Sequence, residues 1–157
     1  NAHGLEQIEF RVAAHKGLPL RPLAKVASGG ELSRISLAIQ VITSKVGTVP
    51  ALIFDEVDVG IGGKVAEIVG HLLKKLGRER QVLCITHLPQ VAATGDHQWQ
   101  VEKSAGQSAH QPVISTITML DQQQRVEEIA RMLGGVSITE TTRQHAAEML
   151  QQHAQPL

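Results

Sequence analysis

Two short, uninterrupted apolar runs, at residues 51–54 and 82–85, constrain the fold of this chain more than any other feature. Strands that are covered on both faces, as in parallel sheets, have such continuous apolar sequences. Between the two runs, apolar residues recur at helical spacing over residues 65–76, and Gly77 marks the end of that helix. A strand, a helix and a strand in this order predict a parallel pair joined by a crossover helix, and therefore an α/β fold.

The spacing of apolar residues also predicts elements on both sides of this unit. Alternation or helical periodicity indicates strands at 8–13, 98–103 and 113–120, and helices at 29–46, 126–133 and 139–153. The polar stretch 104–111 is predicted to join its two flanking strands as a hairpin. Glycine and proline make residues 16–22 a predicted loop. We therefore expect a mainly parallel sheet with flanking helices.

Composition limits the classes of function that the chain can have. Its 157 residues, 42% hydrophobic and 19% charged, suit one globular domain over residues 1–157. Fifteen basic residues balance fifteen acidic ones, so no overall positive field attracts nucleic acid. Aromatic residues make up 2%, which argues against a base-stacking surface. Any DNA contact is expected to be local or to lie elsewhere in the protein.

Several features indicate a cytoplasmic protein with no membrane partner. The single cysteine, Cys84, lies within an apolar run and is predicted to be a buried, inert thiol of a reducing compartment. No apolar stretch approaches the roughly 20 residues that cross a bilayer. Residues 1–4 do not resemble a signal peptide and suggest a cut into a longer chain.

The first motif with chemical meaning is SGGELSR at residues 28–34, where the first helix is predicted to begin. Two glycines allow the backbone to approach an anion closely, and the first turn of a helix offers free N–H groups and a positive dipole. The motif therefore predicts an anion-binding site. The alternative is an ordinary helix cap with a flexible glycine pair.

The second motif is the pair Asp55 and Glu56, which directly follows the apolar run 51–54. Ligands collect at the carboxyl edge of strands in open α/β sheets, and a buried strand would hold Asp55 there. Asp55 could then orient the water shell of a phosphate-bound Mg²⁺. Glu56 could polarise an attacking water as a general base. The alternative is an acidic strand end that leads into a solvated turn.

The third motif is His87, at the end of the second apolar run. A histidine at this edge could contact a γ-phosphate. The alternative is a structural histidine. The other seven histidines show no spacing typical of metal ligands, so no zinc site is predicted. The order of the three motifs is nevertheless that of the second half of an ABC-type ATPase, and three unrelated structural features are not expected to coincide in this order.

The motif sequences resemble the RecN family of SMC-like, ABC-class DNA repair ATPases. Residues 27–34 (ASGGELSR) resemble its signature motif, and residues 54–63 (FDEVDVGIGG) resemble its Walker B motif and D-loop. Residues 81–92 (QVLCITHLPQVA) are similar to the segment that carries its switch histidine. The close resemblance runs from about residue 17 to 103. It implies the C-terminal lobe of an ATPase head, in a protein that repairs DNA double-strand breaks and is associated with the nucleoid.

The resemblance also implies a composite ATP site between two heads of a homodimer. It assigns eight residues to such sites: Ser28, Gly29, Gly30, Glu31, Asp55, Glu56, Asp58 and His87. The first four would face ATP held by the opposite head. Asp55, with Mg²⁺ through water, and the catalytic Glu56 and His87 would serve the nucleotide of their own head. Asp58 would bridge the dimer interface.

One departure from a complete ATPase concerns the phosphate-binding loop. No G-x-x-x-x-G-K-[ST] motif occurs in the sequence, so the chain alone is predicted to be inactive. The missing loop and the coiled-coil arm would belong to the rest of the protein, and the N-terminal Walker A lobe would be a partner. The alternatives are a non-catalytic ABC-like docking module and the nucleotide-binding subunit of a membrane transporter. Glu31, where transporters usually carry Gln, favours the SMC-like head.

Overall fold

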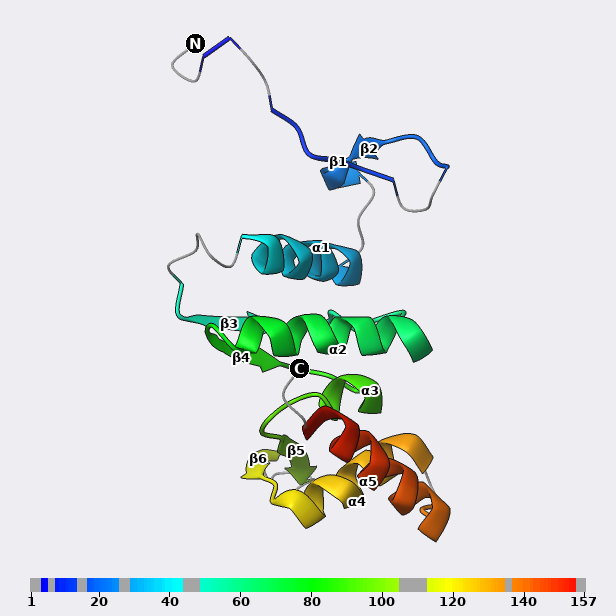
Figure 1. Ribbon diagram of the computed structural model, residues 1–157. Helices are drawn as coiled ribbons and strands as arrows, with labels where there is room; N and C mark the ends of the chain where they lie inside the picture. Colours follow the sequence, from blue (N-terminus) through cyan, green and yellow to red (C-terminus); the bar gives the residue numbers. More distant parts are fainter. Residues whose placement is uncertain are drawn as a thin grey trace.

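The computed structural model describes residues 4–5, 8–13, 17–25, 29–43, 49–104, 113–134 and 137–154 (Figure 1). Short strands and helices follow one another along this chain: β1 (Arg11–Val12), β2 (Arg21–Pro22), the 3₁₀ turn η1 (Leu23–Lys25), α1 (Gly29–Ile42), β3 (Ala51–Phe54), α2 (Gly63–Gly77), β4 (Gln81–Cys84), α3 (Pro89–Ala92), β5 (Trp99–Ser104), β6 (Ile114–Met119), α4 (Gln122–Gly134) and α5 (Glu140–Ala154). None of the helices in these ranges is both long and apolar enough to span a bilayer.

The predicted strand–helix–strand unit is present as β3, α2 and β4. The two strands pair in parallel, from Ala51 opposite Gln81 to Phe54 opposite Cys84. Helix α2 forms the crossover, and its buried face repeats at the spacing of an amphipathic helix. Lysines in its last turn complement the negative end of the helix dipole. The α/β class predicted from the sequence is therefore confirmed.

The main hydrophobic core lies around α2, with α1 packed against it (Figure 1). Leu37 of α1 and Leu76 of α2 are almost completely buried, as is Val57 in the loop after β3. This packing holds the start of α1 near the carboxyl end of β3. The core thus places the first two predicted motifs on the same part of the molecule.

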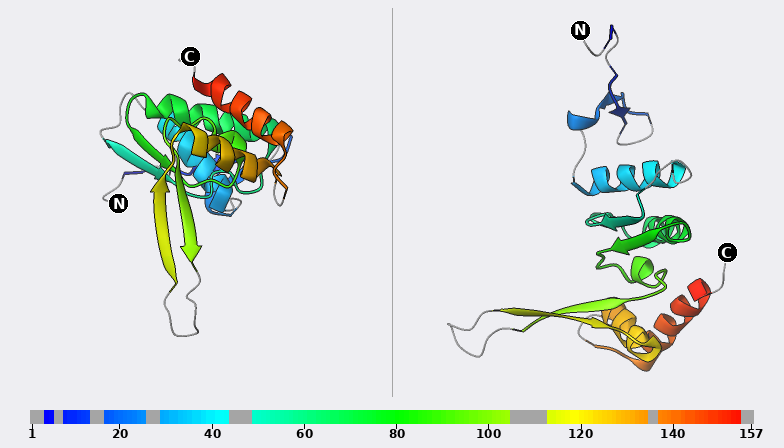
Figure 2. Two further views of the ribbon diagram at one scale, coloured as in Figure 1. Left: turned by 90° about the horizontal axis from the view of Figure 1, so that it is seen from below. Right: turned by 90° about the vertical axis from the view of Figure 1, so that its left-hand side faces the viewer.

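A second, smaller core joins α3, α4 and α5. It contains Ala93, Ile129, Ala130 and Ala146, all buried. The antiparallel β5–β6 hairpin, with Trp99 opposite Met119, projects from the body of the molecule (Figure 2). The hairpin was predicted from two alternating stretches, and its strands lie within one residue of the predicted bounds.

The strands differ from the single, mainly parallel sheet that was predicted. Those of the described ranges pair two by two, and only β3–β4 is parallel. The strand predicted at 8–13 is reduced to two residues, which pair with two residues of the predicted loop 16–22. Because β3 and β4 pair only with each other, the parallel part of the sheet gains no third strand from the described chain. The first helix was predicted to end near residue 46, whereas α1 ends at Ile42, and residues 44–48 lie outside the described residues.

Candidate functional site

The N-terminus of α1 lies against the segment that follows β3. A Cβ atom built on Gly29 would come within 2.9 Å of Glu56 Oε2. One on Gly30 would meet the backbone oxygens of Glu56 at 3.1 Å and of Val59 at 3.2 Å. The contacts at Gly30 involve backbone oxygens, which cannot easily move, so this position favours glycine, whereas the Glu56 side chain could turn away from a Cβ at position 29. The structure therefore brings the glycines of the first motif and the carboxylate of the second together.

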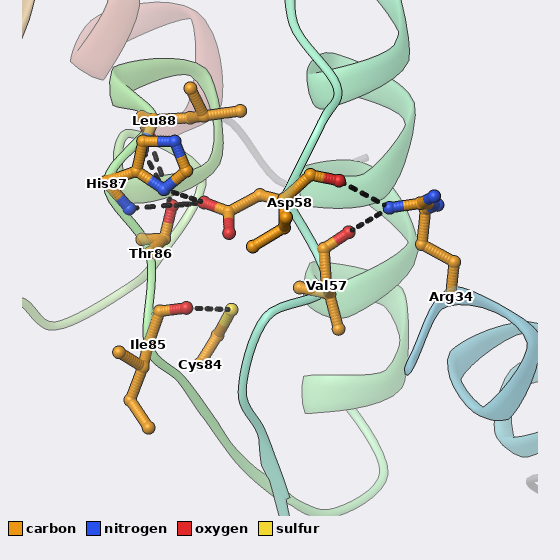
Figure 3. A network of polar contacts seen from close by, with 9 residues as sticks. Arg34, Val57, Asp58, Cys84, Ile85, Thr86, His87 and Leu88 are labelled. Carbon is orange, nitrogen blue, oxygen red and sulfur yellow. Dashed lines mark hydrogen bonds and ion pairs between the residues drawn. The ribbon is translucent and has the colours of Figure 1, made fainter. Parts of the chain in front are cut away.

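Two side chains of α1, Ser33 and Arg34, fasten the helix to the same loop. Ser33 Oγ donates a hydrogen bond to the Asp55 carbonyl oxygen at 3.0 Å. Arg34 Nη1 donates to the Val59 carbonyl oxygen at 2.9 Å and lies 3.4 Å from that of Val57 (Figure 3). Sequence reasoning assigned no contact to Ser33 or Arg34. Their position one turn after the glycines was the available signal, because residues at such spacing share a helix face.

The two predicted site carboxylates follow β3 directly, and both Asp55 and Glu56 are exposed. Glu56 has a φ angle of 60°, which is unusual for a residue with a side chain. Strained backbone of this kind clusters at functional sites. After this residue the chain turns sharply, with the Val59 N–H donating to the Glu56 carbonyl oxygen at 3.3 Å. The turn places Asp55 and Glu56 at the carboxyl end of a parallel strand, as the sequence predicted.

Asp58 links this turn to the loop after β4. Its side chain is only 2% exposed. Oδ2 accepts hydrogen bonds from the Thr86 hydroxyl and from the backbone N–H of His87, the latter at 3.2 Å (Figure 3). The His87 ring is exposed, and its Nδ1 lies 3.5 Å from the same oxygen. The predicted role of Asp58 at a dimer interface stays a prediction, and it would require this inward-facing side chain to turn outward.

Cys84, at the end of β4, lies near the carboxylates of Asp58 and Asp55. Burial of the thiol, together with these two negative charges, raises its pKa to about 12. A thiol with so high a pKa carries almost no thiolate at neutral pH. Cys84 is thus a packing residue of this region, in agreement with the sequence-based expectation of an inert thiol.

The remaining predicted residues of the first motif are placed only in part. Glu31 is half-buried in the first turn of α1, and Ser28 lies outside the described residues. The side chains fit an Mg²⁺ ion that is bound mainly by phosphate oxygens and water. Asp55 offers one exposed carboxylate, and the described residues contain no cluster of three or more metal-binding side chains.

Comparisons with known proteins identify the family of the chain. No protein-family model matches the sequence. The chain is 56% identical over 149 residues to the DNA repair protein RecN of Vibrio cholerae, which covers 94% of this chain and 26% of that protein. It is 47% identical to RecN of Streptomyces coelicolor over 148 residues, with 94% of this chain and 25% of that protein covered. For RecN of Bacillus subtilis the identity is 43% over 149 residues, with 95% and 25% covered.

A solved structure from work on ATP-driven dimerisation and DNA-stimulated activation of SMC ATPases has a similar fold. Its TM-score is 0.52 at 20% sequence identity, with 77% of this chain and 70% of that chain covered. At this identity the likeness concerns the fold alone, and it supports the α/β fold class. The identities of 43–56% across nearly the whole chain show that it belongs to the RecN family, in which it spans about a quarter of the length of its relatives.

Proposed function

We propose that residues 1–157 form the C-terminal lobe of an ABC-type ATPase head in an SMC-like DNA repair protein. The complete protein would hydrolyse ATP at composite sites between two heads. The observation that carries this proposal is the approach of Gly29 to Glu56, whose Oε2 lies 2.9 Å from the place of a Cβ on the glycine. It supports a site in which the start of α1 would bind an anion beside a carboxylate that would activate water.

Each lobe would contribute to two ATP sites. Glu56 would polarise the attacking water of its own head as general base, and His87 would contact the γ-phosphate of the same nucleotide. Asp55 would hold the water shell of an Mg²⁺ ion, whose charge would offset that of the phosphates. The signature residues Ser28 and Gly29, with Gly30 and Glu31, would face ATP held by the other head. Two identical heads related by a two-fold axis form two such sites.

An N-terminal Walker A lobe would complete the sheet and hold the nucleotide. On β3, Ile53 is 71% exposed, and just beyond β4, Ile85 is 58% exposed. Within the described ranges β3 and β4 pair only with each other. A two-stranded sheet with exposed isoleucines and unpaired edges is marginal in water, and further strands would cover it. This supports the proposal that a second lobe belongs here.

DNA would act on the complete protein through regions outside this lobe. The fifteen basic and fifteen acidic residues of the chain leave it without net charge. Binding of a protein to the phosphates of DNA requires clustered positive charge. The relatives are DNA repair proteins by name, which supports a role in DNA repair. Repair of double-strand breaks at the nucleoid, in the cytoplasm, is part of this proposal.

The experiment that tests the composite site is nucleotide-dependent pairing of heads, followed by size-exclusion chromatography with light scattering. The full-length protein carrying Glu56→Gln should bind ATP, fail to hydrolyse it and accumulate as closed dimers. Adding Ser28→Arg should abolish this closure while ATP binding is retained, because the large cation blocks the signature face. Normal closure of the double variant would contradict the assigned role. If both variants still hydrolyse ATP, the result would favour a non-catalytic docking role for this lobe.

A further inference from the structure

Among the charged residues that the structure describes, Asp58 is the one whose side chain is buried, at 2% exposure. Its sequence neighbour Val57 belongs to the hydrophobic core. A carboxylate in such surroundings is costly unless hydrogen-bond donors or positive charge compensate it. The partners of Asp58 therefore indicate why the carboxylate is there.

All of the side-chain partners of Asp58 come from one place, the loop after β4. Oδ2 accepts from the Thr86 hydroxyl and from the His87 N–H at 3.2 Å, and it lies 3.5 Å from His87 Nδ1 (Figure 3). These residues are 28 and 29 positions away along the chain. One carboxylate oxygen thus binds the backbone, a neighbouring hydroxyl and the ring of the switch histidine.

Both ends of this connection are themselves fixed. Arg34 Nη1 lies within 3.4 Å of the carbonyl oxygens of Val57 and Val59, on either side of Asp58. On the other side, the Leu88 N–H donates to the Thr86 hydroxyl at 3.0 Å, just before α3. Contacts from α1 and from the start of α3 therefore fix the position of the Asp58 carboxylate, and none of these contacts involves a nucleotide.

The His87 ring depends on this carboxylate for its orientation. The ring is 68% exposed, and its Nδ1 lies 3.5 Å from Asp58 Oδ2. A carboxylate beside one ring nitrogen keeps the proton on that nitrogen and fixes the ring plane. Nε2 is then the nitrogen that faces outward from the loop.

We propose that Asp58 is a positioning residue for His87, whose buried carboxylate fixes the ring and presents Nε2 to the nucleotide. The proposal rests on the proposed function for the identity of what His87 contacts. The contact itself lies within the chain and exists without substrate. Asp58 acts through His87 and touches neither nucleotide nor water in the reaction.

The first test is spectroscopic and needs no turnover. In the full-length protein with labelled histidine, the ring resonances that disappear in His87→Gln belong to His87. The wild type should show the tautomer protonated at Nδ1, and Asp58→Asn should shift it to a mixture because the charge is lost. Asp96→Asn is the matched control, since Asp96 is 75% exposed and pairs with Lys74. An unchanged His87 tautomer in folded Asp58→Asn overturns the proposal.

The second test is kinetic and separates positioning from a general loss of structure. We expect Asp58→Asn to lower kcat about 10- to 100-fold with little change in KM, as for other residues that orient a functional histidine. In the His87→Gln background, Asp58→Asn should cause no further loss, because its effect acts through that ring. An equal additional loss in this background overturns the proposal.

The two tests also separate this proposal from the proposed function. A wild-type protein that binds ATP without hydrolysing it would contradict the ATPase assignment. The ring resonances would still decide the role of Asp58, since a tautomer that changes in Asp58→Asn supports positioning in either case. A variant that unfolds is recognised by its melting curve, and Asp58→Glu then replaces it: the charge is retained, and the wild-type tautomer is expected.

Discussion

The guanidinium of Arg34 donates a hydrogen bond from Nη1 to the carbonyl oxygen of Val59 at 2.9 Å, across 25 residues of sequence. Together with the hydrogen bond from Ser33 to the Asp55 carbonyl oxygen, it attaches helix α1 to the loop after β3, which carries Asp55 and Glu56. Any movement of this helix is therefore transmitted to that loop. The relationship makes Arg34 a structural part of the site although it is not proposed to touch ATP.

Arg34→Ala should destabilise the lobe by about 1 to 3 kcal/mol, because carbonyl oxygens lose a charged donor. The shift of the urea midpoint, followed by circular dichroism, measures this change. Arg11→Ala is the matched control: in its ion pair with Glu9 both side chains are more than half exposed, so the pair should contribute less than about 1 kcal/mol. Equal midpoints for the two variants would show that the Arg34 contacts carry no stability.

Gly70 is predicted to be intolerant of even a methyl group. A Cβ there would lie 2.8 Å from Thr94 Cγ2 and 3.3 Å from the Gln90 carbonyl oxygen, because α2 and α3 touch at this point. Gly70→Ala should therefore cost about 1 to 3 kcal/mol through overpacking. Gly77→Ala, at the open end of α2, meets nothing within 4 Å and should be neutral or slightly stabilising.

The Gly70 prediction has its own internal check by thermal melting. Thr94→Ser removes the methyl carbon that would lie 2.8 Å from the new Cβ and keeps the hydroxyl, which would lie 2.9 Å from it and donates to the Val91 carbonyl oxygen at 2.7 Å. The double variant Gly70→Ala/Thr94→Ser should recover part of the lost stability. Additive losses would mean that the close approach of the two helices is not the cause.

Cys84 should react slowly with alkylating reagents in the native protein. Its pKa of about 12, against an ordinary value of 9.0, leaves on the order of a thousand times less thiolate than in an unfolded chain. Alkylation by iodoacetamide at pH 8, followed by mass spectrometry, should accelerate sharply when urea is added. Equal rates in native and unfolded protein would contradict the burial of this thiol.

The stability of the folded protein should depend on pH through His153 on α5. Burial lowers the pKa of His153 from its ordinary value of 6.5, and the neighbouring His71 and Lys74 lower it further. The folded state therefore binds this proton less readily than the unfolded state. The contribution of His153 to stability is complete above pH 6.5 and is lost as the pH falls towards the lowered value.

Urea unfolding at pH values between about 8 and 5 measures this dependence. His153→Gln should flatten the decline of the midpoint at low pH, because an uncharged amide replaces the ring. His145→Gln on the same helix, where the residue is exposed, should leave the decline unchanged. A decline that persists in His153→Gln would assign the effect to other groups.

The sequence predicted those parts of the molecule that local patterns encode. The apolar runs of β3 and β4 and the periodicity of α2 predicted their pairing and crossover correctly. The expected cover on both faces of these strands was wrong for the described chain, in which Ile53 of β3 is 71% exposed. The four-residue helix α3 was missed, since one turn is too short for a periodic signal. The two-residue pairing of β1 with β2 was missed for the same reason.

Contacts between segments far apart in the sequence were beyond such patterns. The residue types at Asp55, Glu56 and His87 predicted a strand-edge site, and the structure places them there. The contact of Asp58 with His87 spans 29 residues and depends on how two loops pack. Neither residue shows it alone, and the resemblance had suggested an interface role for Asp58 instead.

Steady-state ATP hydrolysis by this chain, alone and mixed with a separately produced lobe that carries the Walker A motif, tests directly whether the active site is divided between two lobes. We expect no hydrolysis by the chain alone, turnover on mixing, and loss of that turnover when Glu56→Gln is introduced. Hydrolysis by the chain alone that Glu56→Gln abolishes would contradict the divided active site. If the two lobes bind each other and the mixture still does not hydrolyse ATP, the catalytic role proposed for this lobe is contradicted.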